Sequence, residues 1–134
     1  MIELILNKIK IDENRSEQVI VLKEREGERL LPVVIGIAEV NAIKLKLSGI
    51  EPPRPLTHDL LLNAIRELGA ELKAVHIDKL ENNTFHAKLI LSRNGSGEVK
   101  VDARPSDSVA LAIRAGSPIY VAPEVLDEAG VSEF

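Results

Sequence analysis

The sequence contains no cysteine and no tryptophan, and its 134 residues include only one tyrosine and two phenylalanines. Without cysteine the chain cannot form disulfides, thiolate zinc sites, iron-sulfur clusters or a cysteine nucleophile. The shortage of aromatic side chains excludes the rows of stacking residues on which single-strand binders and RNA-recognition sheets rely. Any chemistry must therefore come from oxygen and nitrogen side chains.

Positive charge is also scarce, because 17 Lys and Arg residues face 21 Asp and Glu residues, a formal net charge of -4. Such a chain repels nucleic acid as a whole, so contact with a polyanion needs a local basic patch. The N-terminal segment lacks the apolar core of a signal peptide, and no later segment is long and apolar enough for a membrane helix. We expect one soluble, cytoplasmic domain over residues 1–134.

The apolar periodicity predicts alternating strands and helices. Strands are expected at 2–11, 19–23, 30–35, 70–80, 85–91, 99–102 and 119–121. Helices are expected over 37–47, from Thr57 to Leu68, from a Ser106 cap through 109–113 to Gly116, and from Pro123 toward Gly130. Turns are expected at 12–16, 82–83 and 94–97, and three prolines make 51–55 a stiff loop.

Two parts of the chain resemble each other. A gapless shift of 68 positions (71 − 3) lays residues 3–48 over 71–116 and matches Glu3 with Glu71 and Val33 with Val101. The match predicts an α+β domain with a mixed sheet, built from a duplicated strand-strand-strand-helix unit. The same shift places Glu39 on Asp107, so both units carry a carboxylate near a helix start.

Two loops bring charged side chains to helix N-termini: Arg54, His58 and Asp59 in the first, and Asp102, Arg104 and Asp107 in the second. Free N–H groups and the helix dipole attract anions to such positions. The same field keeps Asp59 and Asp107 ionised, which suits them as hard oxygen ligands for Mg²⁺ or Mn²⁺. Glu39 lies on an otherwise apolar helix face and needs a partner or a metal.

The same residues also have purely structural explanations. Acids such as Asp59 and Asp107 are common in the first turn of a helix. Arg54 and Arg104 suit ion pairs that hold the loops in place. Sequence alone does not choose between these explanations and the functional one.

Two dense motifs resemble the bifunctional nuclease (DNase/RNase) domain family: Arg-Pro-x-Thr-His-Asp-Leu-Leu at 54–61 and Asp-Ala-Arg-Pro-Ser-Asp-Ser-Val-Ala-Leu-Ala at 102–112. The resemblance covers nearly the whole chain, although His86 stands where an aromatic residue is usual. It implies a mixed α/β domain, hydrolysis of RNA and DNA phosphodiester bonds, and self-association. A homodimer or a higher homo-oligomer is expected.

With this resemblance, the charged loops lead to a catalytic hypothesis whose core residues are His58, Asp59, Arg104 and Asp107. The expected ligands of a divalent metal, Mg²⁺ or Mn²⁺, are Glu39, Asp59, Asp102 and Asp107. Arg54 and Arg104 would hold the scissile phosphate, and His58 would transfer a proton. The hypothesis requires the fold to bring the two loops together.

Two other functions fit the same residues. One is a non-catalytic oligomeric module whose arginine and acid loops bind a small anion or brace an interface. The other is a phosphoesterase acting on a small substrate, which suits the negative net charge better than a long polymer does. Metal dependence and competition by mononucleotides would separate these alternatives from a nuclease.

Overall fold

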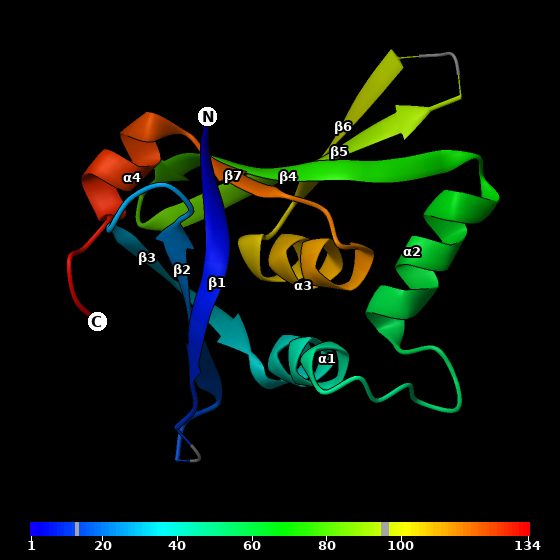
Figure 1. Ribbon diagram of the computed structural model, residues 1–134, viewed down its shortest axis with the longest axis horizontal. Helices are drawn as coiled ribbons and strands as arrows, with labels where there is room; N and C mark the ends of the chain where they lie inside the picture. Colours follow the sequence, from blue (N-terminus) through cyan, green and yellow to red (C-terminus); the bar gives the residue numbers. More distant parts are fainter. Residues whose placement is uncertain (13, 95–96) are drawn as a thin grey trace.

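The computed structural model describes residues 1–12, 14–94 and 97–134 (Figure 1). Its elements are β1 (Ile2–Lys10), β2 (Glu17–Glu24), β3 (Leu30–Gly36), α1 (Ile37–Leu47), α2 (Thr57–Glu67), β4 (Ala70–Glu81), β5 (Thr84–Arg93), β6 (Gly97–Ala103), α3 (Pro105–Ala115), β7 (Ile119–Val121) and α4 (Pro123–Ala129). Each predicted helix and strand is present. The turns predicted at 12–16 and 94–97 include residues 13, 95 and 96, which lie outside the described residues.

Seven strands form one mixed sheet in the order β3-β2-β1-β7-β4-β5-β6. Two antiparallel meanders, β1-β2-β3 and β4-β5-β6, make up its two sides. The short β7 joins them at the centre, antiparallel to β1 and parallel to β4. Figure 1 shows the meanders meeting at a steep angle, with α3 in the space between them. This arrangement confirms the predicted α+β class with a mixed sheet.

The two meanders and their following helices have the same order of elements. From β7 outwards, β1, β2 and β3 on one side correspond to β4, β5 and β6 on the other. A shift of 68 positions moves the bounds of α1, 37–47, onto those of α3, 105–115. Common origin of the two units stays a prediction, which a superposition of residues 3–48 on 71–116 would test.

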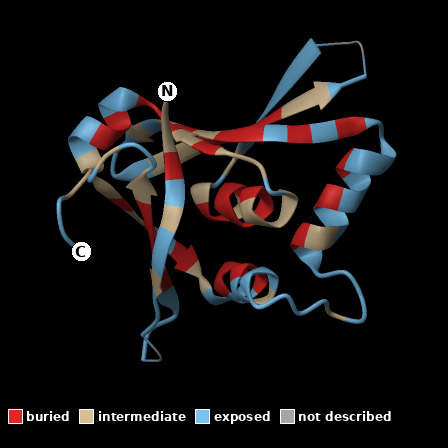
Figure 2. Cartoon of the chain, in the orientation of Figure 1, coloured by how far each residue is buried: buried red, intermediate tan, exposed pale blue. Residues whose placement is uncertain are grey.

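The helix α3 lies at the centre of the molecule and is largely buried (Figure 2). It contacts α1 and α2 as well as β3, β4 and β5. Its buried residues include Val109, Ala110, Leu111 and Ala112, whose small and branched side chains allow close packing from several directions. Because α3 is enclosed in this way, its first turn is held firmly against the starts of α1 and α2.

The starts of α2 and α3 differ from the prediction. The N-cap positions belong to Leu56 and Arg104, and not to Thr57 and Ser106. Pro105 occupies the first helical position of α3, where its missing N–H costs nothing and its fixed φ suits the helix. The predicted caps were wrong because proline chemistry, rather than a hydroxyl, sets where α3 begins.

The helices are short and have well-defined C-terminal ends. Gly69 and Gly116, predicted as helix stops, have φ values of 82° and 70°, the left-handed conformation that glycine adopts easily. The longest helices contain 11 residues, whereas a bilayer requires about 20. None of the helices in the described ranges has the length and apolar character needed to cross a membrane.

Candidate active site

Arg104 lies at the junction of β6 and α3, and two carboxylates bind its guanidinium. Its Nε donates to Asp107 Oδ2 at 3.0 Å, and its Nη2 lies 2.9 Å from the same oxygen and 3.0 Å from Glu39 Oε1. Hydrogen bonding and charge from Asp107, with a smaller contribution from Glu39, raise the pKa of Arg104. The side chain is still 70% exposed. The permanently charged guanidinium of Arg104 is thus bound by two carboxylates, while most of the side chain remains exposed to solvent.

Glu39 reaches Arg104 from the first turn of α1, and its side chain is only 9% exposed. The carboxylate packs against Gly36, because a Cβ at that position would lie 2.9 Å from Glu39 Oε2. Glycine therefore leaves room for the buried carboxylate at the end of β3. The partner that the sequence required for Glu39 is the guanidinium of Arg104.

His58 extends the same group of side chains from the first turn of α2. Its Nε2 lies 3.0 Å from Asp107 Oδ1, and its side chain is 11% exposed. Asp107 thus binds His58 with one oxygen and Arg104 with the other. A carboxylate in this position fixes the orientation of an imidazole and favours the tautomer with hydrogen on Nε2.

Glu39, His58, Arg104 and Asp107 together form what we call the Arg104 cluster. Its members come from the starts of α1, α2 and α3, the three helices that pack against one another through α3. The fold therefore joins the two loops singled out in the sequence, and it does so through the contact between His58 and Asp107.

Two hollows flank the cluster. One, of about 620 Å³, lies between α2, α3 and the strands β5 and β6. The other, of about 400 Å³, lies between the end of β3, the start of α3 and the β4-β5 turn. Thr84, Phe85 and Arg104 line both hollows. Arg104 consequently stands where an extended ligand would pass from one hollow into the other.

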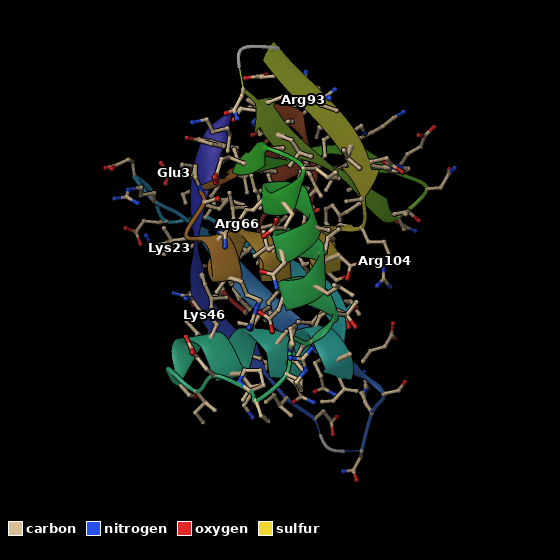
Figure 3. The ribbon with its side chains drawn as sticks, turned by 90° about the vertical axis from the view of Figure 1, so that its right-hand side faces the viewer. Glu3, Lys23, Lys46, Arg66, Arg93 and Arg104 are labelled. Carbon is tan, nitrogen blue, oxygen red and sulfur yellow. The ribbon has the colours of Figure 1, made fainter. Side chains whose placement is uncertain are left out.

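Asp59 does not belong to this cluster. Its carboxylate binds Arg114 and also accepts the backbone N–H of Leu56 at 3.0 Å. Arg114 follows Asp107 by seven residues on α3, which corresponds to about 10 Å along the helix axis. Asp59 lines a third hollow of about 280 Å³, together with Arg66 and Lys46. Figure 3 shows Arg104 on one side of α2, with Arg66 and Lys46 toward the other.

Arg114 is the structurally important residue that sequence reasoning missed. Its side chain is only 9% exposed, and its Nη1 donates to the carbonyl oxygen of Ala42 in α1 at 2.9 Å. A basic residue in the last turn of a helix is ordinary in sequence, because it suits the helix dipole. The one available signal was its place on α3, among apolar residues, where a buried charge requires an acid.

Asp102 points away from Asp107. On β6, Val101 and Ala103 pair with Leu89 and Ala87, which face the core, whereas Asp102 pairs with Lys88. Side chains alternate between the two faces of a strand, so the Asp102 carboxylate lies on the opposite face. It lies 3.5 Å from Lys88 Nζ and is 79% exposed.

The structure therefore does not gather the four carboxylates expected to hold a metal. Glu39 and Asp107 bind Arg104, Asp59 binds Arg114, and Asp102 lies by Lys88. Within residues 1–12, 14–94 and 97–134, no group of three or more His, Asp or Glu side chains is arranged to hold a metal ion. The expected ligands do not fit a shared metal site in this arrangement.

Arg54, the second expected phosphate ligand, lies in the exposed proline loop between α1 and α2. It forms no hydrogen bond or ion pair within the part of the chain that the structure describes. It also lines neither of the hollows beside Arg104. The structure thus leaves Arg104 as the arginine that faces both hollows.

The fold and the Arg104 cluster define a small α+β domain with a charged site at the meeting point of three helix starts. A model of the bifunctional nuclease domain matches residues 20–133 of this chain, which includes every residue of the cluster. The chain therefore belongs to the bifunctional nuclease domain family, as the motifs at 54–61 and 102–112 indicated.

The chain is also similar to individual proteins. It is 50% identical over 123 residues to an uncharacterized protein of Mycobacterium tuberculosis, and this alignment covers 92% of this chain and 73% of that protein. It is 25% identical over 116 residues to bifunctional nuclease 1 of Oryza sativa subsp. indica, and 30% identical over 106 residues to bifunctional nuclease 1 of Arabidopsis thaliana. These alignments cover 84% and 76% of this chain, but only 35% and 32% of the two plant proteins.

Proposed function

We propose that the protein is a nuclease that hydrolyses phosphodiester bonds in RNA and DNA at the Arg104 cluster. The observation that carries this proposal is the state of Arg104, which two carboxylates hold in place while 70% of its side chain stays exposed between two hollows. Membership of the bifunctional nuclease domain family and the names of the plant relatives support the same chemistry.

Arg104 is proposed to bind the scissile phosphate. A guanidinium has five N–H donors, and Nε and Nη2 serve Asp107 and Glu39. Nη1 donates to none of the groups that the structure describes, so its two N–H groups remain for phosphate oxygens. Because the guanidinium is already oriented by its two partners, little reorganisation is needed as negative charge develops on the phosphate.

His58 is proposed to transfer the proton and Asp107 to position it. With Nε2–H donated to Asp107, Nδ1 keeps a lone pair for a proton from the attacking water. The water oxygen forms the new bond to phosphorus while the bond to the leaving sugar oxygen breaks. The proton on His58 is then passed to the leaving oxygen or to solvent. His58 lines the larger hollow beside Arg104, as this role requires.

The charge of the cluster limits how strongly it binds phosphate. Arg104 contributes one positive charge, and Glu39 and Asp107 contribute two negative charges. Tight binding of a polyanion therefore requires further positive charge, which a divalent metal such as Mg²⁺ or Mn²⁺ would supply. Metal dependence stays a prediction, and no step above depends on it.

The test is a cleavage assay with purified protein on labelled RNA and DNA, with and without chelator. We expect cleavage of both polymers and a loss of about 10²- to 10³-fold for Asp107→Ala, the size typical for removal of one such group. Activity that survives in chelator would reject metal dependence but leave the nuclease proposal intact. Full activity of Asp107→Ala, with the melting temperature unchanged, would reject the site.

The same assay addresses the other functions. Strong competition by mononucleotides would favour a phosphoesterase that acts on small substrates. Absence of cleavage together with stable self-association would favour a non-catalytic oligomeric module. Formation of a homodimer or larger homo-oligomer is itself a prediction, and sedimentation equilibrium would contradict it by showing only the 14.7 kDa species at high micromolar concentration.

A further inference from the structure

We propose that the substrate of the Arg104 cluster is a single strand, bound with its two nucleosides spread apart into the hollows on either side of Arg104. This inference rests on the proposed nuclease function and narrows it to a class of nucleic acid. It would also make the site selective for an internal phosphodiester, because a terminal phosphate has a nucleoside on one side only.

The first argument is the size and position of the hollows. Their volumes of about 620 and 400 Å³ fall in the range of small-molecule sites, roughly 300 to 1,000 Å³. Arg104 lines both of them, so a phosphate bound to its guanidinium has a nucleoside-sized space on each side. A duplex backbone presents no such branches, because its bases are stacked and paired.

The second argument is the chemistry of the walls. The surface of the larger hollow is mainly apolar, and the large apolar residues that line it are Leu61, Phe85, Leu89, Val101 and Leu111. Two of these large apolar residues are also well exposed, Leu61 at 41% and Val101 at 39%. Binding of an apolar ring face against this surface is favourable, because it removes exposed apolar area from water. The face of a nucleobase meets that requirement, and an inorganic phosphate does not.

Phe85 is the one Phe, Tyr or Trp among the described residues that line these hollows, and it lines both of them, whereas the imidazoles of His58 and His86 line the larger one. The sequence has one other phenylalanine, the C-terminal Phe134, whose ring centroid lies 4.8 Å from Lys10 Nζ at the end of β1. Stacking of a base on an aromatic ring strengthens binding by about 5- to 100-fold and tolerates any base. Phe85 therefore suits a nucleobase without imposing a strong sequence preference.

The third argument is the scarcity of basic side chains at the site, because Arg104 is the one Lys or Arg among the described residues that line the two hollows. The cluster itself carries two acids, and the whole chain has a net charge of -4. A duplex-binding enzyme relies on many phosphate contacts along the backbone. Here binding must come from a few groups that hold one phosphate and its adjoining bases, which a flexible single strand can offer.

The experiment compares a 12-nucleotide single strand with the same strand annealed to its complement, as DNA and as RNA. Binding is followed by fluorescence anisotropy and cleavage by gel. Because extruding a base from a duplex costs a few kcal/mol, we expect single strands to bind and be cut at least about tenfold better. Equal binding and equal cleavage of the duplex would overturn the inference.

Variants locate the effect. Phe85→Leu keeps an apolar side chain but loses the ring, so we expect single-strand binding to weaken by about 5- to 100-fold at unchanged melting temperature. Phe134→Leu is the matched control and should bind as the unaltered protein does. Equal affinities for both variants would overturn the assignment of the hollows. So would weaker self-association of Phe85→Leu with unchanged strand binding, because a second copy would then occupy them.

The binding measurement also keeps this inference separate from the proposed function. If neither strand is cut but single strands still bind far better than duplex, the nuclease proposal fails and the single-strand site stands. If both forms are cut at equal rates, the nuclease proposal stands and the single-strand site fails.

Discussion

The two meander-and-helix units differ most where they meet at Arg104. Under the 68-residue shift, Glu39 of the first unit corresponds to Asp107 of the second, and both carboxylates bind the same guanidinium. Arg104 itself corresponds to Gly36, which lies directly against the Glu39 carboxylate. One unit thus supplies the arginine, and the other supplies the space that lets a second carboxylate reach it.

The strands that precede α1 and α3 also differ, because β6 is more exposed than β3. Four residues of β3 are intermediate in exposure or open to solvent, but Leu31, Val33 and Ile35 are buried. No residue of β6 is buried, and its Val99 and Val101 remain more than one third exposed. The outer strand of the second unit is therefore the more exposed to solvent. The comparison indicates that the Arg104 cluster lies beside the more exposed of the two outer strands.

The largest expected effect comes from the residue that the two units do not share. Arg104→Ala should reduce cleavage by about 10²- to 10³-fold, because it removes the group that binds the developing charge on the phosphate. Arg25→Ala is a suitable control, since Arg25 lies in the turn between β2 and β3, is 57% exposed and pairs with Glu3 of β1. Rates measured on RNA and DNA would contradict the assignment if both variants behaved alike.

The next largest effect is expected at Arg114, whose counterpart in the first unit under the 68-residue shift is Lys46. Arg114→Met should lower the free energy of unfolding by about 3 kcal/mol, because it leaves the largely enclosed Asp59 unpaired. Lys46→Met changes an exposed residue and should stay within about 0.5 kcal/mol. Urea denaturation of both variants is the measurement. Equal costs would mean that the contact between Arg114 and Asp59 does not hold α2 to α3.

A smaller effect is expected at Gly36. Gly36→Ala places a Cβ 2.9 Å from Glu39 Oε2, so the carboxylate must move and its hold on Arg104 weakens. We expect about tenfold lower activity with less than about 1 kcal/mol of lost stability, because the displaced group is the end of a flexible side chain. In a Glu39→Gln background the same change should add little. An additive loss would show that Gly36 acts by another route.

The smallest effect concerns pH and the hairpin of the first unit. Hydrogen bonds from Arg29 hold the pKa of Glu24 below its usual value of 4.5. A carboxylate with a lowered pKa in the folded state stabilises the protein above pH 4.5, and this contribution is lost as the pH falls through the folded pKa. Glu24→Gln should therefore reduce the difference between melting temperatures at pH 6 and pH 3. An unchanged difference would rule out this contribution.

Much of the fold was predictable because it depends on local patterns. The alternation in β1 and the proline loop before α2 are short-range signals. The helix over 37–47 was predicted despite the strand-like alternation of Ile43 to Leu47, and the structure confirms it. Prediction failed at Thr57 and Ser106, which are not caps, because a cap depends on the conformation of the residue before the helix.

The candidate site was predictable in its residue types but not in its partners. His58, Arg104, Asp107 and Glu39 were all singled out, and they form one cluster. Asp59 and Asp102 were expected in the same place, yet they lie beside Arg114 and Lys88. Side chains that are close in sequence on a helix or strand point in different directions, so nearness in sequence to His58 or Arg104 said little about nearness in space.

The sequence by itself determined the secondary structure, the charged loops at two helix starts and the family, because each of these is written in short-range patterns of residue type. The tertiary structure alone decided which carboxylate faces which cation. Glu39 and Arg104 are 65 residues apart, and Arg114 and Asp59 are 55 apart. Such pairings follow from how α1, α2 and α3 pack, since an ion pair is set by a separation of a few ångströms in space.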